Sequence, residues 1–157
     1  YTLFPYTTLF RSSEVFPAWY LGRKPDRQVM FTTYAQDLAD GFGRKVRNAV
    51  ADPRHVRSFP DSVLSEDSQS AKRFNTTAGG VYYAVGAGGP VTGRGADLLL
   101  LDDPLKNREE ADSKLIRDKL WDWYASTAYT RLMPGGAVVL VQTRWHEDDL
   151  AGAAQWA

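Results

Sequence analysis

Hydrophobic positions in this chain follow two patterns that alternate along its length. Short apolar runs predict strands, and segments in which apolar residues recur every three or four positions predict amphipathic helices. The segment Leu38 to Val50 has helical spacing, whereas the run Leu98 to Leu101 is typical of a strand buried on both faces of a sheet. In chain order we expect the end of a helix at 13–22, a strand at 28–33, a helix at 35–50, a hairpin from 72–77 and 80–85, a strand through 98–101, a helix at 109–125, a strand at 137–142 and the start of a helix at 147–154. Strands that alternate with helices predict an α/β fold with a parallel sheet.

The longest apolar run ends in two acids and a proline, Asp102, Asp103 and Pro104. Open α/β sheets bind ligands at the carboxyl ends of their strands, so both carboxylates are expected at the binding edge. The pattern matches a Walker B strand, in which the first acid helps to hold Mg²⁺ and the second polarises the water that attacks a γ-phosphate. Taken alone, the pattern equally fits a buried strand that ends in an Asp-Pro turn.

A second polar segment, Gln142 to Arg144, follows the apolar residues Val138 to Val141. Thr143 is therefore expected at the same edge as Asp103, where a hydroxyl can hydrogen-bond the attacking water or the γ-phosphate. A polar strand end explains the segment as well. The residues HEDD at 146–149 could suggest a metal site, but acids in the first turn of a helix, with His146 as a capping or surface residue, are the simpler interpretation.

The composition is that of an ordinary globular domain. The 157 residues are 43% hydrophobic and 24% charged, which is enough for one core and hardly for two. Cysteine is absent, which excludes disulfides and thiolate metal sites, and no apolar stretch approaches the ~20 residues of a membrane helix. The net charge of zero argues against a wholly basic DNA-coating protein. A local DNA surface remains open at Arg44, Lys45 and Arg47, which could equally be a solvated helix face.

Four segments in this order resemble one known protein family. They are FPAWYLG at 16–22, TYAQDLA at 33–39, GRGADLLLLDDP at 93–104 and QTRWHEDDLAG at 142–152. Together they are similar to the ATPase domain of the large terminase subunit of tailed bacteriophages and prophages, from about Ser13 to the last residue. The resemblance implies a P-loop NTPase fold of the additional-strand type, an α/β three-layer sandwich with a mainly parallel sheet, truncated at both ends. It also implies a motor that hydrolyses ATP with Mg²⁺ to drive viral DNA into a procapsid.

The resemblance also implies roles for residues at the sheet edge. Asp102 would bind the Mg²⁺ of the nucleotide, and Asp103 would act on the attacking water. Thr143 would sense the γ-phosphate, and Gln142 and Arg144 would contact the nucleotide as parts of the same coupling motif.

Arg94 lies in the glycine-rich loop 86–95, between two glycines. The loop is not expected to cradle phosphates, because a strand follows it and no Lys-Ser or Lys-Thr pair is present. In ring motors of the family a similarly placed arginine resembles a finger inserted into the neighbouring subunit's site, where it contributes to catalysis. The alternatives are a salt bridge to Asp97 or a solvated side chain.

The first twelve residues do not fit the family. Residues 2–12 read as the translation of a sequencing-library adapter, so we expect the terminase-like domain to occupy 13–157. The family carries a phosphate-binding loop ending in Gly-Lys-Ser or Gly-Lys-Thr a few residues upstream of the 16–22 segment. Here the adapter-like residues occupy that place, and Arg11-Ser12 lacks the preceding glycine. The family's nuclease domain would begin beyond Ala157. We therefore expect the 157-residue chain itself to be inactive as an ATPase.

The partners implied by the resemblance are double-stranded viral DNA, the portal protein, the small terminase subunit and further copies in a ring, with no membrane. The corresponding location is the cytoplasm of an infected bacterial host, and transiently the procapsid portal. Two alternatives remain open at this point. One is another P-loop DNA motor, such as a helicase, and the other is a metal-dependent nuclease that uses Asp102 and Asp103 directly on DNA.

Overall fold

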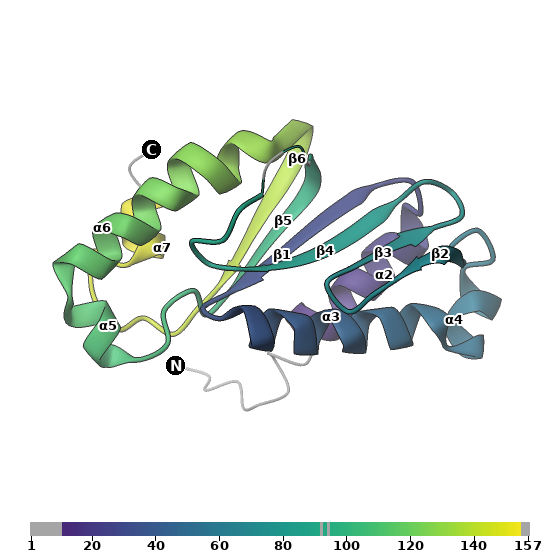
Figure 1. The fold of residues 1–157 in the computed structure, drawn as a ribbon, viewed down its shortest axis with the longest axis horizontal. Coiled ribbons are helices and arrows are strands. Elements are labelled where there is room, and N and C mark those ends of the chain that lie inside the picture. The colour runs from purple at the N-terminus through teal and green to yellow at the C-terminus, as the bar shows by residue number, and fades with distance from the viewer. Residues whose placement is uncertain (1–10, 92, 94, 155–157) are drawn as a thin grey trace.

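The computed structural model describes residues 11–91, 93 and 95–154 (Figure 1). The elements in chain order are η1 (Arg11–Val15), α2 (Phe16–Arg23), β1 (Gln28–Thr33), α3 (Gln36–Ala51), α4 (Pro53–Ser58), β2 (Leu64–Gln69), β3 (Arg73–Thr76), β4 (Val81–Gly86), β5 (Ala96–Asp102), α5 (Arg108–Asp112), α6 (Lys114–Trp123), η2 (Tyr124–Ala128), η3 (Tyr129–Arg131), β6 (Leu132–Val141) and α7 (Leu150–Ala154). No helix in these ranges has both the length and the apolarity that a membrane crossing requires.

The strands form one sheet in the order β2-β3-β4-β1-β5-β6. β1 runs parallel to both β4 and β5, and β6 runs parallel to β5. β3 runs antiparallel to both of its neighbours, β2 and β4. The mainly parallel sheet is as expected, and it brings the carboxyl ends of β1, β5 and β6 to one edge (Figure 1).

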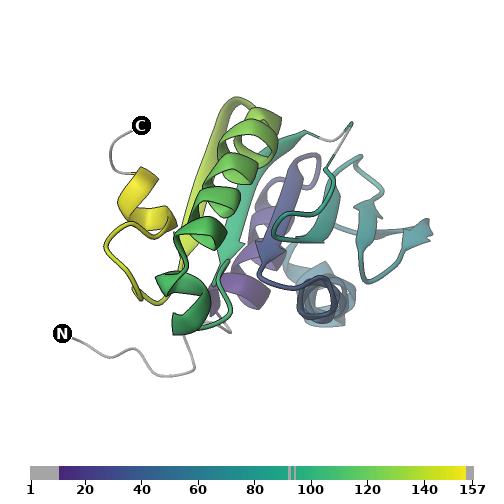
Figure 2. The ribbon, with the colours of Figure 1, turned by 60° about the vertical axis from the view of Figure 1, so that its left-hand side comes forward.

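Helices cover both faces of the sheet, which gives three layers (Figure 2). The four leucines of β5 show how one strand serves both interfaces, because successive side chains of a strand point to opposite faces. Leu98 and Leu100 pack with α2 and α3, whereas Leu99 and Leu101 pack with α6. All four are at most 2% exposed, so the unbroken apolar run reflects a strand buried on both sides.

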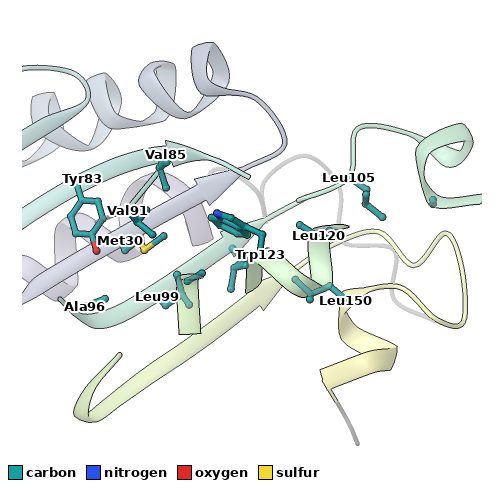
Figure 3. Packing of buried hydrophobic residues seen from close by; sticks show 13 residues of the cluster. Met30, Tyr83, Val85, Val91, Ala96, Leu99, Leu105, Leu120, Trp123 and Leu150 are labelled. Atoms are coloured by element: carbon teal, nitrogen blue, oxygen red, sulfur yellow. The ribbon is translucent and has the colours of Figure 1, made fainter. Parts of the chain in front are cut away.

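The core on the α6 side also holds part of the glycine-rich loop after β4. Figure 3 shows Val91 and Trp123 among the buried residues of this cluster. The Trp123 indole Nε1–H donates to the Gly89 carbonyl at 2.9 Å, so the aromatic ring packs in the core while its polar atom holds the loop.

Several element boundaries differ from the sequence expectation. The helix expected at 109–125 is interrupted at Ser113, whose backbone is extended, and resumes as α6. β6 begins at Leu132 instead of 137, because the chain passes Gly135 with a φ of +78° and re-enters register with β5. β2 and α4 were not expected from the sequence. β2 is a polar edge strand, and α4 starts at Pro53 because the Asp52 side chain accepts a hydrogen bond from the Arg54 N–H.

Candidate functional site

Asp102, the last residue of β5, is a buried carboxylate that is only partly satisfied. Its residue is 1% exposed, and Oδ2 accepts a hydrogen bond from the Ser13 hydroxyl at 2.5 Å. The other oxygen, Oδ1, is buried and has no hydrogen-bond partner among the described residues. Such an atom costs free energy unless a water, an ion or a ligand group binds it.

The surroundings of Asp102 favour its neutral form. The pKa of Asp102 is raised from 3.8 to about 6. Burial is the main cause, the hydrogen bond from Ser13 opposes it, and the charge of Asp103 adds to it. A cation beside the carboxylate would reverse this preference. The sequence assigns no role to Ser13. Its place in η1, directly before the 16–22 segment, is the one signal that points to it.

Asp103 connects β5 to the segment that follows β6. Its N–H donates to the Val141 carbonyl at 2.9 Å, and its Oδ1 accepts the Thr143 N–H at 2.8 Å. The φ angle of Asp103 is +41°, the only positive value at a non-glycine position in the described part of the chain. Residues in this region cost energy and persist where the surroundings hold them, often at functional sites. The structure thus brings Asp103 and Thr143 together, as the sequence predicts.

Two more buried polar atoms without a partner lie at the neighbouring strand ends. They are Thr32 Oγ1 on β1 and Gln142 Nε2 just after β6. Thr32 pairs in register with Leu101, the residue before Asp102, and Val141 pairs with Asp102. The ends of three adjacent strands therefore present polar atoms whose hydrogen bonds the described residues do not supply.

The residues after Thr143 are arranged differently from the expected helical turn. α7 begins only at Leu150, and the His146 ring Nδ1 accepts the Asp148 N–H at 3.0 Å. The Arg144 Nε–H donates to Asp149 Oδ2 at 2.7 Å. Within the described residues no group of three or more His, Cys, Asp or Glu side chains is placed to hold a metal ion.

A family model for the N-terminal region of the T4likevirus-type large terminase subunit matches residues 10–157. The chain belongs to this terminase family. A search of curated proteins finds no match.

The fold agrees with this assignment. The crystal structure of the HK97 bacteriophage large terminase is similar, with a TM-score of 0.50 at 13% sequence identity. The likeness covers 83% of this chain and 25% of the HK97 chain, so the terminase chain spans about a quarter of the length of that protein. The α/β sandwich expected from the resemblance is therefore confirmed.

The structure bears on the basic residues near Asp97 and on α3. Arg94 lies outside the described residues, but Asp97, its possible salt-bridge partner, accepts hydrogen bonds from Arg27 Nη1 at 2.7 Å and from the Gln28 N–H at 2.8 Å. On α3, Lys45 pairs with Glu14 and the Arg47 guanidinium donates to the Gln69 carbonyl. These contacts connect α3 to η1 and to β2, and Arg44 and Lys45 are both exposed.

Proposed function

We propose that this chain is part of the ATP-hydrolysing motor that packages viral DNA into a procapsid. The observation that supports it most is the pair of acids at the end of β5 in a chain of the terminase family. Asp102 is buried with an oxygen that no described residue hydrogen-bonds, and Asp103 is hydrogen-bonded to Thr143 across the sheet edge. Two neighbouring carboxylates in such different surroundings can take different roles.

In this proposal Asp102 holds Mg²⁺ of a bound Mg²⁺·ATP. Carboxylate oxygens are the ligands that Mg²⁺ prefers, and Mg²⁺ sites with nucleotides use one or two carboxylates together with phosphates and water. The unpartnered Oδ1 of Asp102 and the hydroxyl of Ser13 fit this chemistry. When bound, the metal would neutralise charge on the transferring phosphoryl group.

Asp103 orients and polarises the attacking water in the same proposal. Its Oδ1 is held by the Thr143 N–H, which leaves the other carboxylate oxygen to accept a hydrogen bond from the water. Thr143 lies where a change in the γ-phosphate reaches β6 and the segment after it. Gln142, with its unpartnered Nε2, and Arg144 contribute contacts to the phosphates.

The partners that go with this function are double-stranded viral DNA, the portal protein, the small terminase subunit and further copies in a ring, in the cytoplasm of the infected host. Arg94 is the candidate finger that acts on a neighbour's site. In rings of full-length protein, Arg94→Ala subunits that are inactive alone should regain hydrolysis when mixed with Asp103→Asn subunits, since each supplies what the other lacks. Absence of recovery in rings shown to be mixed would make Arg94 a local residue.

ATP turnover tests the assignment of the acids. The 157-residue chain should not hydrolyse ATP, because its sequence contains no Gly-Lys-Ser or Gly-Lys-Thr loop to position the phosphates. In the full-length protein Asp102→Ala should weaken Mg²⁺·ATP binding, whereas Asp103→Asn should keep binding and lose turnover. Near-normal turnover of the Asp103→Asn protein would contradict the role of Asp103. Turnover by the 157-residue chain that Asp103→Ala abolishes would contradict the need for that loop.

A further inference from the structure

Asp149 is a buried acid that the roles proposed above do not use. The residue is 1% exposed. Its Oδ2 accepts the Arg144 Nε–H at 2.7 Å, and its Oδ1 accepts the Gly152 N–H at 3.1 Å. Burying a charge is costly unless it is paired, and both oxygens of Asp149 have such partners. The two neighbouring acids, Glu147 and Asp148, are exposed.

The segment from Arg144 to Gly152 closes on itself around this ion pair. A second nitrogen of Arg144, Nη2, donates to the Glu147 carbonyl at 3.2 Å. A Cβ at Gly152 would lie 1.9 Å from the same carbonyl oxygen, so the backbone approach requires glycine at this position. Leu150 fixes the closed segment to the rest of the molecule, since it packs in the α6-side core with Leu120 (Figure 3).

The residue before Arg144 is Thr143, whose N–H donates to Asp103. An ion pair that immobilises Arg144 therefore also restricts where the Thr143 N–H can point. Asp103 has a costly positive φ, and such a conformation persists only where its contacts hold it. The Thr143 N–H is one of the two hydrogen bonds that do so.

We propose that Asp149 is a positioning residue of the ATP site. Through its ion pair with Arg144 it keeps the Thr143 N–H on the Asp103 carboxylate, and so sets the direction in which Asp103 presents its other oxygen to water. The ion pair also holds Arg144, so that its remaining nitrogen, Nη1, faces a fixed direction. This inference rests on the proposed function for its catalytic consequence, but the ion pair and its effect on Thr143 do not.

A role in capping α7 is the competing explanation, because Asp149 accepts the Gly152 N–H. Asp149→Ser separates the two, since serine is a good helix cap but cannot pair with arginine as a carboxylate does. Arg144→Gln removes the ion pair from the exposed side and leaves the cap untouched. Asp148→Asn is the matched control, because it neutralises the adjacent, exposed acid.

Amide hydrogen exchange followed by NMR in the 157-residue chain measures the effect without any turnover. We expect Asp149→Ser and Arg144→Gln each to speed exchange at Thr143 by about tenfold, and the double variant to do no more than either alone. Amides of Leu99 and Leu100 in β5 should exchange as before. Unchanged exchange at Thr143 in both single variants, or an equal effect of Asp148→Asn, would overturn the proposal.

Turnover by the full-length protein tests the catalytic consequence. Asp149→Ser should lower kcat for ATP by about tenfold or more and leave KM for ATP within about twofold, because a misdirected Asp103 affects the transition state more than substrate binding. Faster exchange at Thr143 with unchanged kcat would overturn the positioning role. A full-length protein without ATPase activity would contradict the proposed function instead, while the exchange result would still decide whether the ion pair holds Thr143.

Discussion

Replacing Asp102 by asparagine should make the chain more stable at neutral pH. The substitution keeps the size of the side chain and an oxygen that can accept the Ser13 hydroxyl. It removes a carboxylate whose pKa is raised, mainly by burial, to about 6. A raised pKa means that the folded state binds the proton more tightly than the unfolded state does. The folded state is thus penalised as pH rises and the carboxylate must ionise.

The size of this penalty follows from the pKa. A rise from 3.8 to about 6 corresponds to about 3 kcal/mol at 1.36 kcal/mol per tenfold change in proton affinity. The penalty is absent below about pH 4, grows between about pH 4 and about pH 6, and is complete above that range. Asparagine does not titrate, so the stability gained by Asp102→Asn should grow over the same interval by up to about 3 kcal/mol.

Urea unfolding of both proteins at a series of pH values, in the presence of EDTA, measures this gain. The difference between the two proteins is the informative quantity, because the titration of every other group largely cancels in it. The exposed Asp148→Asn should change stability by less than about 0.5 kcal/mol. A gain from Asp102→Asn that is constant between about pH 4 and about pH 7, or that shrinks, would refute the view that Asp102 is a desolvated carboxylate.

Two further predictions test the packing that supports the site. Leu100→Ala should destabilise the chain by about 2–5 kcal/mol because Leu100 is fully buried, whereas Leu115→Ala, at a position that is 63% exposed, should cost less than about 0.5 kcal/mol in the same urea experiment. Gly43→Ala should be strongly destabilising, because its Cβ would lie 2.0 Å from a backbone carbonyl oxygen, whereas Gly41→Ala meets nothing within 4 Å and should stabilise α3 by about 0.5–1 kcal/mol. Equal thermal midpoints for the Gly43→Ala and Gly41→Ala proteins would show that α3 does not approach the backbone of Ala71 this closely.

The parts of the fold that could be predicted from sequence are those in which burial and periodicity agree. The strand at 28–33 was expected with the bounds that β1 has, and the helix at 35–50 differs from α3 by one residue at each end. β2 could not be predicted in this way, because its sequence LSEDSQ is polar and the strand forms by pairing with β3 at the edge of the sheet. The interruption of the helix at Ser113 could not be predicted either, since helical residues lie on both sides of it.

The site could be predicted only where it depends on strand ends. Parallel pairing of β5 and β6 is enough to bring Asp103 and Thr143 to one edge. Pairing of Arg144 with Asp149 could not be predicted, because it depends on a chain reversal between them that no periodicity encodes. Helix propensity predicts solvent-exposed acids at 147–149, but in the structure Asp149 is buried and only Glu147 and Asp148 are exposed.

The places where this chain departs from local rules gather at one edge of the sheet. Among the described residues five buried side-chain polar atoms lack a partner, and three of them, on Thr32, Asp102 and Gln142, lie at the ends of adjacent strands. Asp103, the single non-glycine residue with positive φ in the described part of the chain, directly follows Asp102. Leu98 to Leu101 of β5 are at most 2% exposed, and burial of this core offsets the free energy lost at the edge. A chain selected for stability alone would remove these conflicts, and their concentration beside two carboxylates is what a ligand-binding edge requires.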